Sequence, residues 1–202
     1  MSLIYDYYVT QYSEKFKRVL IDKNECERIK IFAKYLAEAK AKEKHHLKDS
    51  GQAEKRFITG TMGEAALEKL FGIDIIDWSI GESAFYHNPD VPNYNVGIKT
   101  VEQGKFPIIF KNNEYPQIIC IRSGKIDNLI FVCGLATPAV LNRYQSDDLI
   151  LSDNLRARGT KTAFFGFSEL RQVNSIDDIE KYKKIDNFEK KRKKIVDICN
   201  NR

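Results

Sequence analysis

The segment that best indicates the fold and chemistry of this chain is Phe85-Tyr-His-Asn-Pro-Asp-Val-Pro-Asn-Tyr-Asn-Val-Gly-Ile-Lys-Thr100. A Pro-Asp pair that ends in Asp90 closes one extended stretch, and Lys99 stands nine positions later, at the end of the next apolar run. A carboxylate and a lysine that meet across a hairpin can hold a divalent metal ion beside a scissile phosphate. The carboxylate is then the ligand, and the ammonium group supports the attacking water or the developing charge. The position two before Lys99, where a second acidic side chain would complete such a site, is Gly97.

Each of these residues also has an ordinary structural interpretation. Pro-Asp is common in turns, so Asp90 also fits a turn residue. Strand alternation predicts one face with Gly97, Lys99 and Val101 and an opposite face with Val96, Ile98 and Thr100. A lysine in the middle of a sheet needs a partner, and Asp90 on the neighbouring strand would supply it. A simple cross-strand ion pair, worth about 0–1 kcal/mol when exposed, is therefore the alternative to a metal site.

Length and composition indicate an ordinary globular protein. The chain has 202 residues, of which 43% are hydrophobic and 30% charged, enough for one full core and unlike a disordered chain. No apolar run reaches the length of a bilayer span, and no basic region precedes an apolar stretch at the N-terminus, so we expect a cytoplasmic protein with no membrane partner. The cysteines form no C-x-x-C pair, which predicts reduced thiols and no zinc site. They are Cys26, Cys120, Cys133 and Cys199.

The net charge of +5 is mild, and its distribution is more informative than its size. Residues 181–194 are rich in lysine, and Arg156, Arg158 and Lys161 form a short basic loop around Gly159. Either segment could contact phosphates. A solvated basic helix is the favoured interpretation of the C-terminal tail, at roughly two to one. For the loop, contact with DNA phosphates and a surface loop with no partner are about equally favoured.

Apolar spacing predicts four helices. Residues 22–46 repeat apolar side chains at intervals of three and four, with Asp22 as N-cap. A second helix is expected from about residue 59 or 61 to Phe71, where Gly72 gives a typical C-terminal signal. Residues 137–144 form a short helix with proline at its first position, and residues 175–200 form a C-terminal one. The aromatic-rich residues 1–21 are expected to be a packing arm.

Between these helices the period changes to that of strands. Expected strands are 73–78, 84–87, 94–101, 107–110, 117–121, 128–133 and, at a sheet edge, 163–167. The 117–121 and 128–133 runs are almost continuously apolar, as in central strands covered on both faces. The order of elements predicts an α/β fold, an α+β mixed sheet flanked by helices, in a single domain over 1–202. Within it we expect an N-terminal arm and helix (1–50), a core (57–170) and a C-terminal basic helix (175–202).

The second helix carries Glu64 at the edge of a broad apolar arc, next to the small residue Gly63. A glycine near the helix start permits close approach to the sheet or to a phosphate. Glu64 would then reach the site as a metal or water ligand. The alternative is a capping box, Thr61-x-x-Glu64, in which the glutamate only satisfies a backbone N–H. The two interpretations are about evenly balanced, roughly one to one.

A helix with Gly-Glu, a strand ending in Pro-Asp and a strand ending in Ile-Lys-Thr, in this order, resemble the PD-(D/E)XK nuclease superfamily over residues 59–135. The resemblance implies a restriction-endonuclease-like core over 57–170 and a Mg²⁺- or Mn²⁺-dependent phosphodiesterase. By motif, Glu64, Asp90 and Lys99 match the helix glutamate, the strand aspartate and the lysine of the family. The second acidic position of the family is Gly97 here, which leaves the backbone carbonyl of Ile98 as a further ligand. Auxiliary positions are Gln103, which shares the strand parity of Lys99, and Glu102, which a bulge could bring round.

The expected function is therefore metal-dependent cleavage of DNA, in which Asp90 and Glu64 hold the metal and Lys99 orients the water. Lys55 and Arg56, with Arg156, Arg158 and Lys161, would position the backbone of the nucleic acid. One rival keeps the fold without catalysis, as a nucleic-acid-binding or assembly module, and Gly97 favours it. A second rival is a structural protein whose aromatic arm and basic helix form an oligomer interface.

Overall fold

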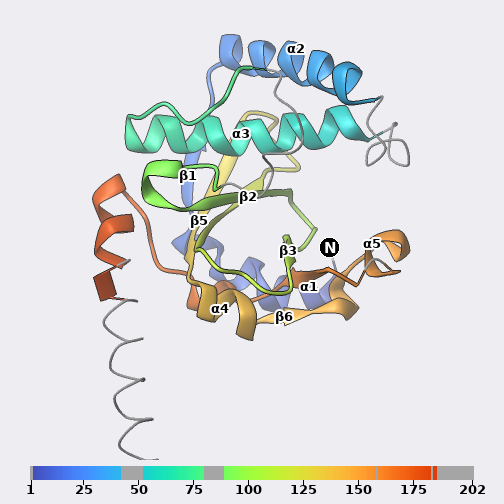
Figure 1. Ribbon diagram of the computed structural model, residues 1–202, viewed down its shortest axis with the longest axis vertical. Helices are drawn as coiled ribbons and strands as arrows, with labels where there is room; N and C mark the ends of the chain where they lie inside the picture. Colours follow the sequence, from blue (N-terminus) through green and yellow to red (C-terminus); the bar gives the residue numbers. More distant parts are fainter. Residues whose placement is uncertain (1, 42–51, 80–88, 158, 183, 186–202) are drawn as a thin grey trace, which may run out of the picture.

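A four-stranded mixed sheet forms the centre of the computed structural model, which describes residues 2–41, 52–79, 89–157, 159–182 and 184–185 (Figure 1). Its strand order is β1-β5-β4-β2. The strands are β1 (Lys17–Leu20), β2 (Gly97–Glu102), β4 (Gln117–Arg122) and β5 (Leu129–Ala136). β2 runs parallel to β4, whereas β5 pairs antiparallel with both β4 and β1. The expected mixed sheet flanked by helices is thus confirmed.

The two apolar runs form the central strands, as predicted. Because successive side chains of a strand point to opposite faces, β4 and β5 supply two hydrophobic clusters. Ile118 and Cys120 belong to the cluster under the long helices, and Ile119 and Ile121 belong to the cluster on the opposite face. All four side chains are buried. Full burial on both faces explains why these runs lack polar alternation.

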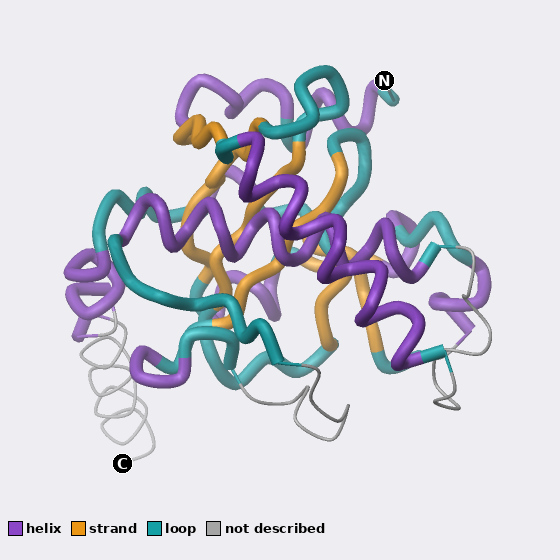
Figure 2. The backbone as a smooth tube through the Cα atoms, turned by 90° about the horizontal axis from the view of Figure 1, so that it is seen from above, coloured by secondary structure: helices purple, strands orange, loops and turns teal. Residues whose placement is uncertain are grey.

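Of two long helices, α3 (Ala53–Phe71) covers one face of this sheet, and α2 (Lys23–Lys40) packs on α3 as an outer helix (Figure 1). Figure 2 shows them lying across the strands. Asp22 precedes α2 in extended conformation, and Gly72 ends α3 with φ of 69°, as its position predicted. The predicted start of α3 was wrong: the helix begins at Ala53, six residues before Thr59. Thr59 and Gly60 are poor helix formers, and the packing of α3 on the sheet overrides that local preference.

The opposite face is covered by a smaller sheet and short helices. The order in this sheet is β3-β7-β6, for β3 (Ile108–Phe110), β7 (Lys161–Phe164) and β6 (Gln145–Ser146). The prediction of an edge strand at 163–167 was wrong, since β7 pairs with β3 on one side and β6 on the other. The helices are α4 (Pro138–Arg143), with Pro138 in its first turn as predicted, and α5 (Asp153–Ala157). The 3-10 turns Asp147–Leu149 and Phe167–Glu169 complete this layer.

The aromatic N-terminal segment belongs to the core and is more than a packing arm. It forms α1 (Leu3–Tyr8), a 3-10 turn (Thr10–Lys15) and the edge strand β1. Tyr5 is buried and its ring contacts Phe106 edge-on, with 5.6 Å between centroids. The strand was missed because Lys17–Leu20 is short and its antiparallel partner, β5, lies more than 100 residues away.

Residues 73–78 were predicted to be a strand, and they are irregular. The carboxylate of Glu68 accepts hydrogen bonds from the backbone N–H groups of Ile75 (2.6 Å) and Ile76 (2.7 Å). A side chain of α3 thus satisfies donors that a sheet ladder would otherwise pair. The predicted strand 84–87 and most of the C-terminal helix lie outside the described residues, but 176–182 and 184–185 are helical. None of the helices in the described ranges has the length and apolar character that crossing a membrane requires.

Candidate active site

Glu64 lies in the interior of α3, so the capping-box interpretation is wrong. Thr61 is eight residues past the first residue of the helix and is buried. Neither residue can therefore cap the helix N-terminus, whose unpaired N–H groups lie in the first turn. A half-buried carboxylate in the middle of a helix needs another explanation.

Gly63 brings this part of α3 against the edge strand β2. A Cβ atom on Gly63 would lie 1.7 Å from Oγ1 of Thr100, far closer than two non-bonded atoms can approach. The close approach that the sequence suggested is therefore present, and it is directed at the sheet. Glu64, the next residue, is held beside the strand that carries Lys99.

Asp90 is held at the entrance to β2 by backbone pairing. Val91 and Val96 form an isolated antiparallel bridge, and a 3-10 turn lies between them. Oδ2 of Asp90 accepts a hydrogen bond from the N–H of Ile98. Because the N–H and C=O of one strand residue point to the same side, the carbonyl of Ile98 faces this same open edge of β2. Asp90 is thus a turn residue whose carboxylate is fixed beside the strand.

Lys99 projects from β2 on the face of Gly97 and Val101, as strand alternation predicted. It is half-buried, and burial lowers its pKa while the charge of Asp90 opposes that change. In the part of the chain that the structure describes, no salt bridge joins Lys99 to Asp90. The simple cross-strand ion pair is therefore absent, and Lys99 keeps its ammonium group directed to a cavity.

Electrostatic coupling connects all three residues through Asp90. Burial raises the pKa of Glu64 to about 7, and the nearby charges of Asp90, Glu68 and Asp77 add to that rise. Asp90 is exposed as a residue, yet protein atoms crowd its carboxyl group. Their desolvation of the group raises its pKa, against the hydrogen bond from Ile98 and the charge of Lys99. Asp90 thus lies close enough to influence both Glu64 and Lys99 through its charge.

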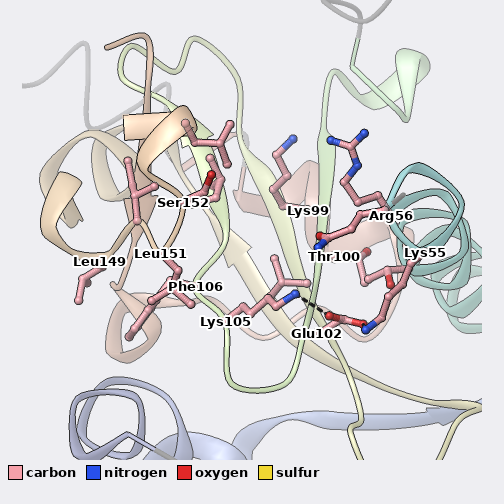
Figure 3. Close-up of a pocket in the computed structure, with 16 residues that line it drawn as sticks. Lys55, Arg56, Lys99, Thr100, Glu102, Lys105, Phe106, Leu149, Leu151 and Ser152 are labelled. Atoms are coloured by element: carbon pink, nitrogen blue, oxygen red, sulfur yellow. Dashed lines mark hydrogen bonds and ion pairs between the residues drawn. The ribbon is translucent and has the colours of Figure 1, made fainter. Parts of the chain in front are cut away.

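A cavity of about 560 Å³ opens beside Lys99, between α3 with β2 on one side and the smaller layer on the other (Figure 3). Its polar wall holds four cations and one carboxylate: Lys55, Arg56, Lys99, Lys105 and Glu102. Its other wall is mostly apolar, and includes Phe106, Leu149, Ile150, Leu151 and Leu155. Two of the residues expected to contact nucleic acid, Lys55 and Arg56, therefore lie on the same cavity as Lys99.

Glu102 is engaged by lysines and is not directed to a metal. Its two oxygens pair with Lys55 and Lys105, each at 2.7 Å. Partial burial raises the pKa of Glu102, but the hydrogen bonds from these lysines outweigh burial and leave the pKa below its usual range. The other auxiliary candidate, Gln103, accepts a hydrogen bond from the N–H of Gly124 (3.0 Å), which fixes a turn. Neither side chain adds an oxygen ligand beside Asp90.

The basic loop contributes less than expected to this cavity. Arg156 donates a hydrogen bond to the carbonyl of Ile150 (2.7 Å), so it stabilises the loop that forms the apolar wall. Lys161 lies over the ring of Phe110, with 5.2 Å to the centroid. Arg158 lies outside the described residues. Neither Arg156 nor Lys161 lines the cavity.

Position 97 faces the site, and two neighbours fill the surrounding space. A Cβ atom there would lie 2.9 Å from Cε2 of Tyr115, 3.4 Å from Cγ of Gln117 and 3.5 Å from Oδ2 of Asp90. Sequence reasoning missed Tyr115 and Gln117. Gln117 was visible only as the polar first residue of an apolar strand, and its place beside Gly97 depends on the register of β4 against β2.

Oxygen ligands suited to Mg²⁺ or Mn²⁺ are present but few. Among the described residues, no group of three or more His, Cys, Asp or Glu side chains could hold a metal ion. The pKa of Glu64 is raised by burial and then by the charges of Asp90, Glu68 and Asp77, and Asp90 is the largest of these charge influences. One buried oxygen nearby, Oε1 of Gln117, lacks any hydrogen-bond donor among the described residues. This all-oxygen set fits a weakly held hard divalent cation, which keeps several waters when bound.

Comparison with known proteins identifies no relative. No family model, no curated protein and no solved structure matches the chain. In the segment that resembles the nuclease superfamily, α3 is followed by β2, β4 and β5 in the large sheet, and β3 is diverted into the smaller sheet. The residues and their geometry are therefore the guides to function.

Proposed function

We propose that this protein is a metal-dependent nuclease that hydrolyses phosphodiester bonds of DNA on a restriction-endonuclease-like, PD-(D/E)XK-type core. The observation that carries the proposal is the place of Asp90. It accepts a hydrogen bond from Ile98 of β2 and interacts through its charge with both Glu64 and Lys99, and Lys99 lines a basic cavity. Glu64, Asp90 and Lys99 come from an interior helix turn, a loop and a strand, and separate structural roles do not account for this coupling. The pKa of Glu64 near 7 shows that its charged form lacks a compensating positive charge, which a bound cation would supply.

In this proposal each residue has a defined role. Asp90 and Glu64 hold Mg²⁺ or Mn²⁺, with the carbonyl of Ile98 available at the same edge of β2. When bound, the metal polarises the phosphate and activates a water molecule. Lys99 orients that water and stabilises the negative charge that develops on the phosphate. The lowered pKa of Lys99 lets it release a proton more readily than an exposed lysine does.

The polar wall of the cavity provides a path for the nucleic-acid backbone. Lys55 and Lys105 share the single carboxylate of Glu102, so this group of three side chains keeps a net positive charge. A phosphate that entered would replace Glu102 as their partner, as in other contacts that position a backbone without reading its sequence. The cations and Lys99 line one cavity, which would place a bound phosphodiester within reach of Lys99.

Cleavage of plasmid DNA in Mn²⁺, Mg²⁺ and EDTA tests this function. Asp90→Ala and Lys99→Ala should each lower the rate by about 100-fold or more, since each removes a group that acts on the transition state. Lys30→Ala is the matched control, because Lys30 is an exposed lysine of α2 that pairs with Glu27 (2.7 Å) away from the cavity. Equal rates for the wild type and both site variants in every metal would rule out the nuclease.

The second candidate is a nucleic-acid-binding module of the same fold without catalysis. Gly97 favours it, because one carboxylate expected from the resemblance is absent. Salt-dependent binding of DNA with no metal-dependent cleavage would support this alternative. If the protein neither binds nor cleaves DNA, a structural or interaction role becomes the remaining candidate function.

A further inference from the structure

Gln117 lies beside the point that the Cβ of a side chain at position 97 would occupy. The two residues are direct partners in the parallel ladder of β2 and β4, so their side-chain directions share one face of the sheet. The point that a Cβ of residue 97 would occupy is 3.4 Å from Cγ of Gln117 and 3.5 Å from Oδ2 of Asp90. The Gln117 side chain and the Asp90 carboxylate thus border the same small volume.

A chain of asparagine contacts fixes the orientation of the Gln117 carboxamide. Nδ2 of Asn113 donates to the carbonyl of Phe110 (2.7 Å) and to Oδ1 of Asn142 (3.3 Å). Oδ1 of Asn113 is therefore the atom that faces Gln117, and it accepts from Nε2 of Gln117 (3.3 Å). Asn142 is held in turn, because its Oδ1 accepts from the N–H of Asn113 (2.9 Å). The amide oxygen of Gln117, Oε1, must point away from this network.

That oxygen is buried and unsatisfied. Gln117 is 5% exposed, and Oε1 has no donor within the part of the chain that the structure describes. An unsatisfied buried acceptor is destabilising, and a network that enforces such an orientation needs a reason. An uncharged amide oxygen held free of donors is a suitable ligand for a hard divalent cation.

We propose that Oε1 of Gln117 is a protein ligand of the divalent cation held by Asp90 and Glu64, in place of the acidic side chain that position 97 lacks. The inference rests on the proposed metal site and deepens it. With two carboxylates and one neutral oxygen, the summed charge of the ligands balances a dication, and an amide takes the place of a third carboxylate. The site would therefore bind Mn²⁺ or Mg²⁺ with moderate affinity and could still support catalysis.

Direct binding of Mn²⁺, followed by electron paramagnetic resonance or calorimetry without DNA, tests this role. Gln117→Met keeps the length of the side chain and removes the oxygen, so the Mn²⁺ affinity should fall about 10-fold or more. Gln117→Glu places a carboxylate at the same site and should bind Mn²⁺ at least as tightly as the wild type. Asp90→Asn is the reference for loss of the site, and near-ultraviolet circular dichroism checks that each variant folds.

The outcomes separate this inference from the proposed function. If Asp90→Asn loses Mn²⁺ while Gln117→Met binds it with wild-type affinity, the metal site stands and the role of Gln117 is wrong. If the wild type binds no Mn²⁺ at millimolar concentration, both are wrong. Should Gln117→Met fail to fold, weaker binding by Gln117→Glu than by the wild type would overturn the role equally well.

Discussion

Tyr115 explains why position 97 holds no side chain in this protein. Its ring lies 2.9 Å from where a Cβ of residue 97 would be, closer than carbon atoms pack, so any larger residue would force the ring to move. The glycine is thus part of a local arrangement in which an aromatic ring, an amide and a carboxylate meet. Restoring an acidic residue at 97 would have to displace Tyr115 before it could add a ligand.

Glu64 should make the folded state lose stability as pH rises from about 4.5 to about 7. Its folded pKa is about 7, whereas that of an unfolded glutamate is near 4.5, so between these values the folded protein binds more protons than the unfolded chain. The contribution of Glu64 to stability is then greatest below pH 4.5 and falls until about pH 7. Above that pH the loss stays constant. Because the residue is only half-buried, solvent screening reduces the expected loss to about 1–3 kcal/mol.

Urea unfolding of the wild type and Glu64→Gln at pH 5 and pH 8, in EDTA, measures this effect. The neutral amide cannot ionise, so Glu64→Gln should lose less stability than the wild type between the two pH values. Mg²⁺ at pH 8 should return stability to the wild type alone, because a cation favours the ionised carboxylate. Identical pH dependence of the two proteins would contradict the raised pKa of Glu64.

At the scale of elements, the packing of α3 on β2 is the feature on which the site depends. Gly63→Ala should destabilise the protein by about 1–3 kcal/mol, because the new methyl group would lie 1.7 Å from Oγ1 and 2.8 Å from Cβ of Thr100. Rotating the hydroxyl group away does not relieve the clash with Cβ. The helix must therefore shift, and Glu64 shifts with it.

Gly60→Ala is the matched control for this prediction. Gly60 lies in the same helix, and a Cβ there would have no atom within 4 Å, so alanine should stabilise α3 by up to about 1 kcal/mol. If α3 packs closely on β2 at Gly63, chemical denaturation should show a lower free energy of unfolding for Gly63→Ala and a higher one for Gly60→Ala. If both alanines stabilise the protein, the helix lies further from the strand than the distances at Gly63 indicate.

Local pattern predicted most elements but not the interactions that build the site. The central strands and the C-terminal end of α3 at Gly72 follow from apolar runs and a glycine signal. The irregular path of 73–78 does not, since it depends on the carboxylate of Glu68 reaching the backbone of Ile75 and Ile76. The place of Gln117 beside Gly97 likewise depends on strand register, which a single sequence does not encode locally.

At the scale of the whole molecule, the cavity exists because the chain between β2 and β4 leaves the large sheet. β2 ends at Glu102, the chain forms β3 in the smaller sheet and then returns to β4 (Figure 1). Lys99 on β2 and residues 149–152 of the smaller layer thereby line one cavity (Figure 3). A mild net charge of +5 conceals this local excess of cations.

DNA binding should therefore weaken when a positive charge is removed from this cavity and strengthen when a negative charge is removed. In EDTA, which prevents metal-dependent cleavage, Lys55→Ala should weaken binding. The slope of its salt dependence should also become shallower by about 0.9 for each phosphate that the protein no longer neutralises. Glu102→Gln should strengthen binding, because it removes the carboxylate that pairs with Lys55 and Lys105 at 2.7 Å.

Fluorescence anisotropy with labelled single-stranded and double-stranded DNA over a salt series measures both effects, and Lys30→Ala, on the outer helix α2, serves as the control. Equal weakening of binding by Lys55→Ala and Lys30→Ala, with strengthening by Glu102→Gln, would mean that DNA senses only the net charge of the molecule. Opposite responses of Lys55→Ala and Glu102→Gln, with Lys30→Ala unchanged, would place the nucleic-acid path in the cavity beside Lys99.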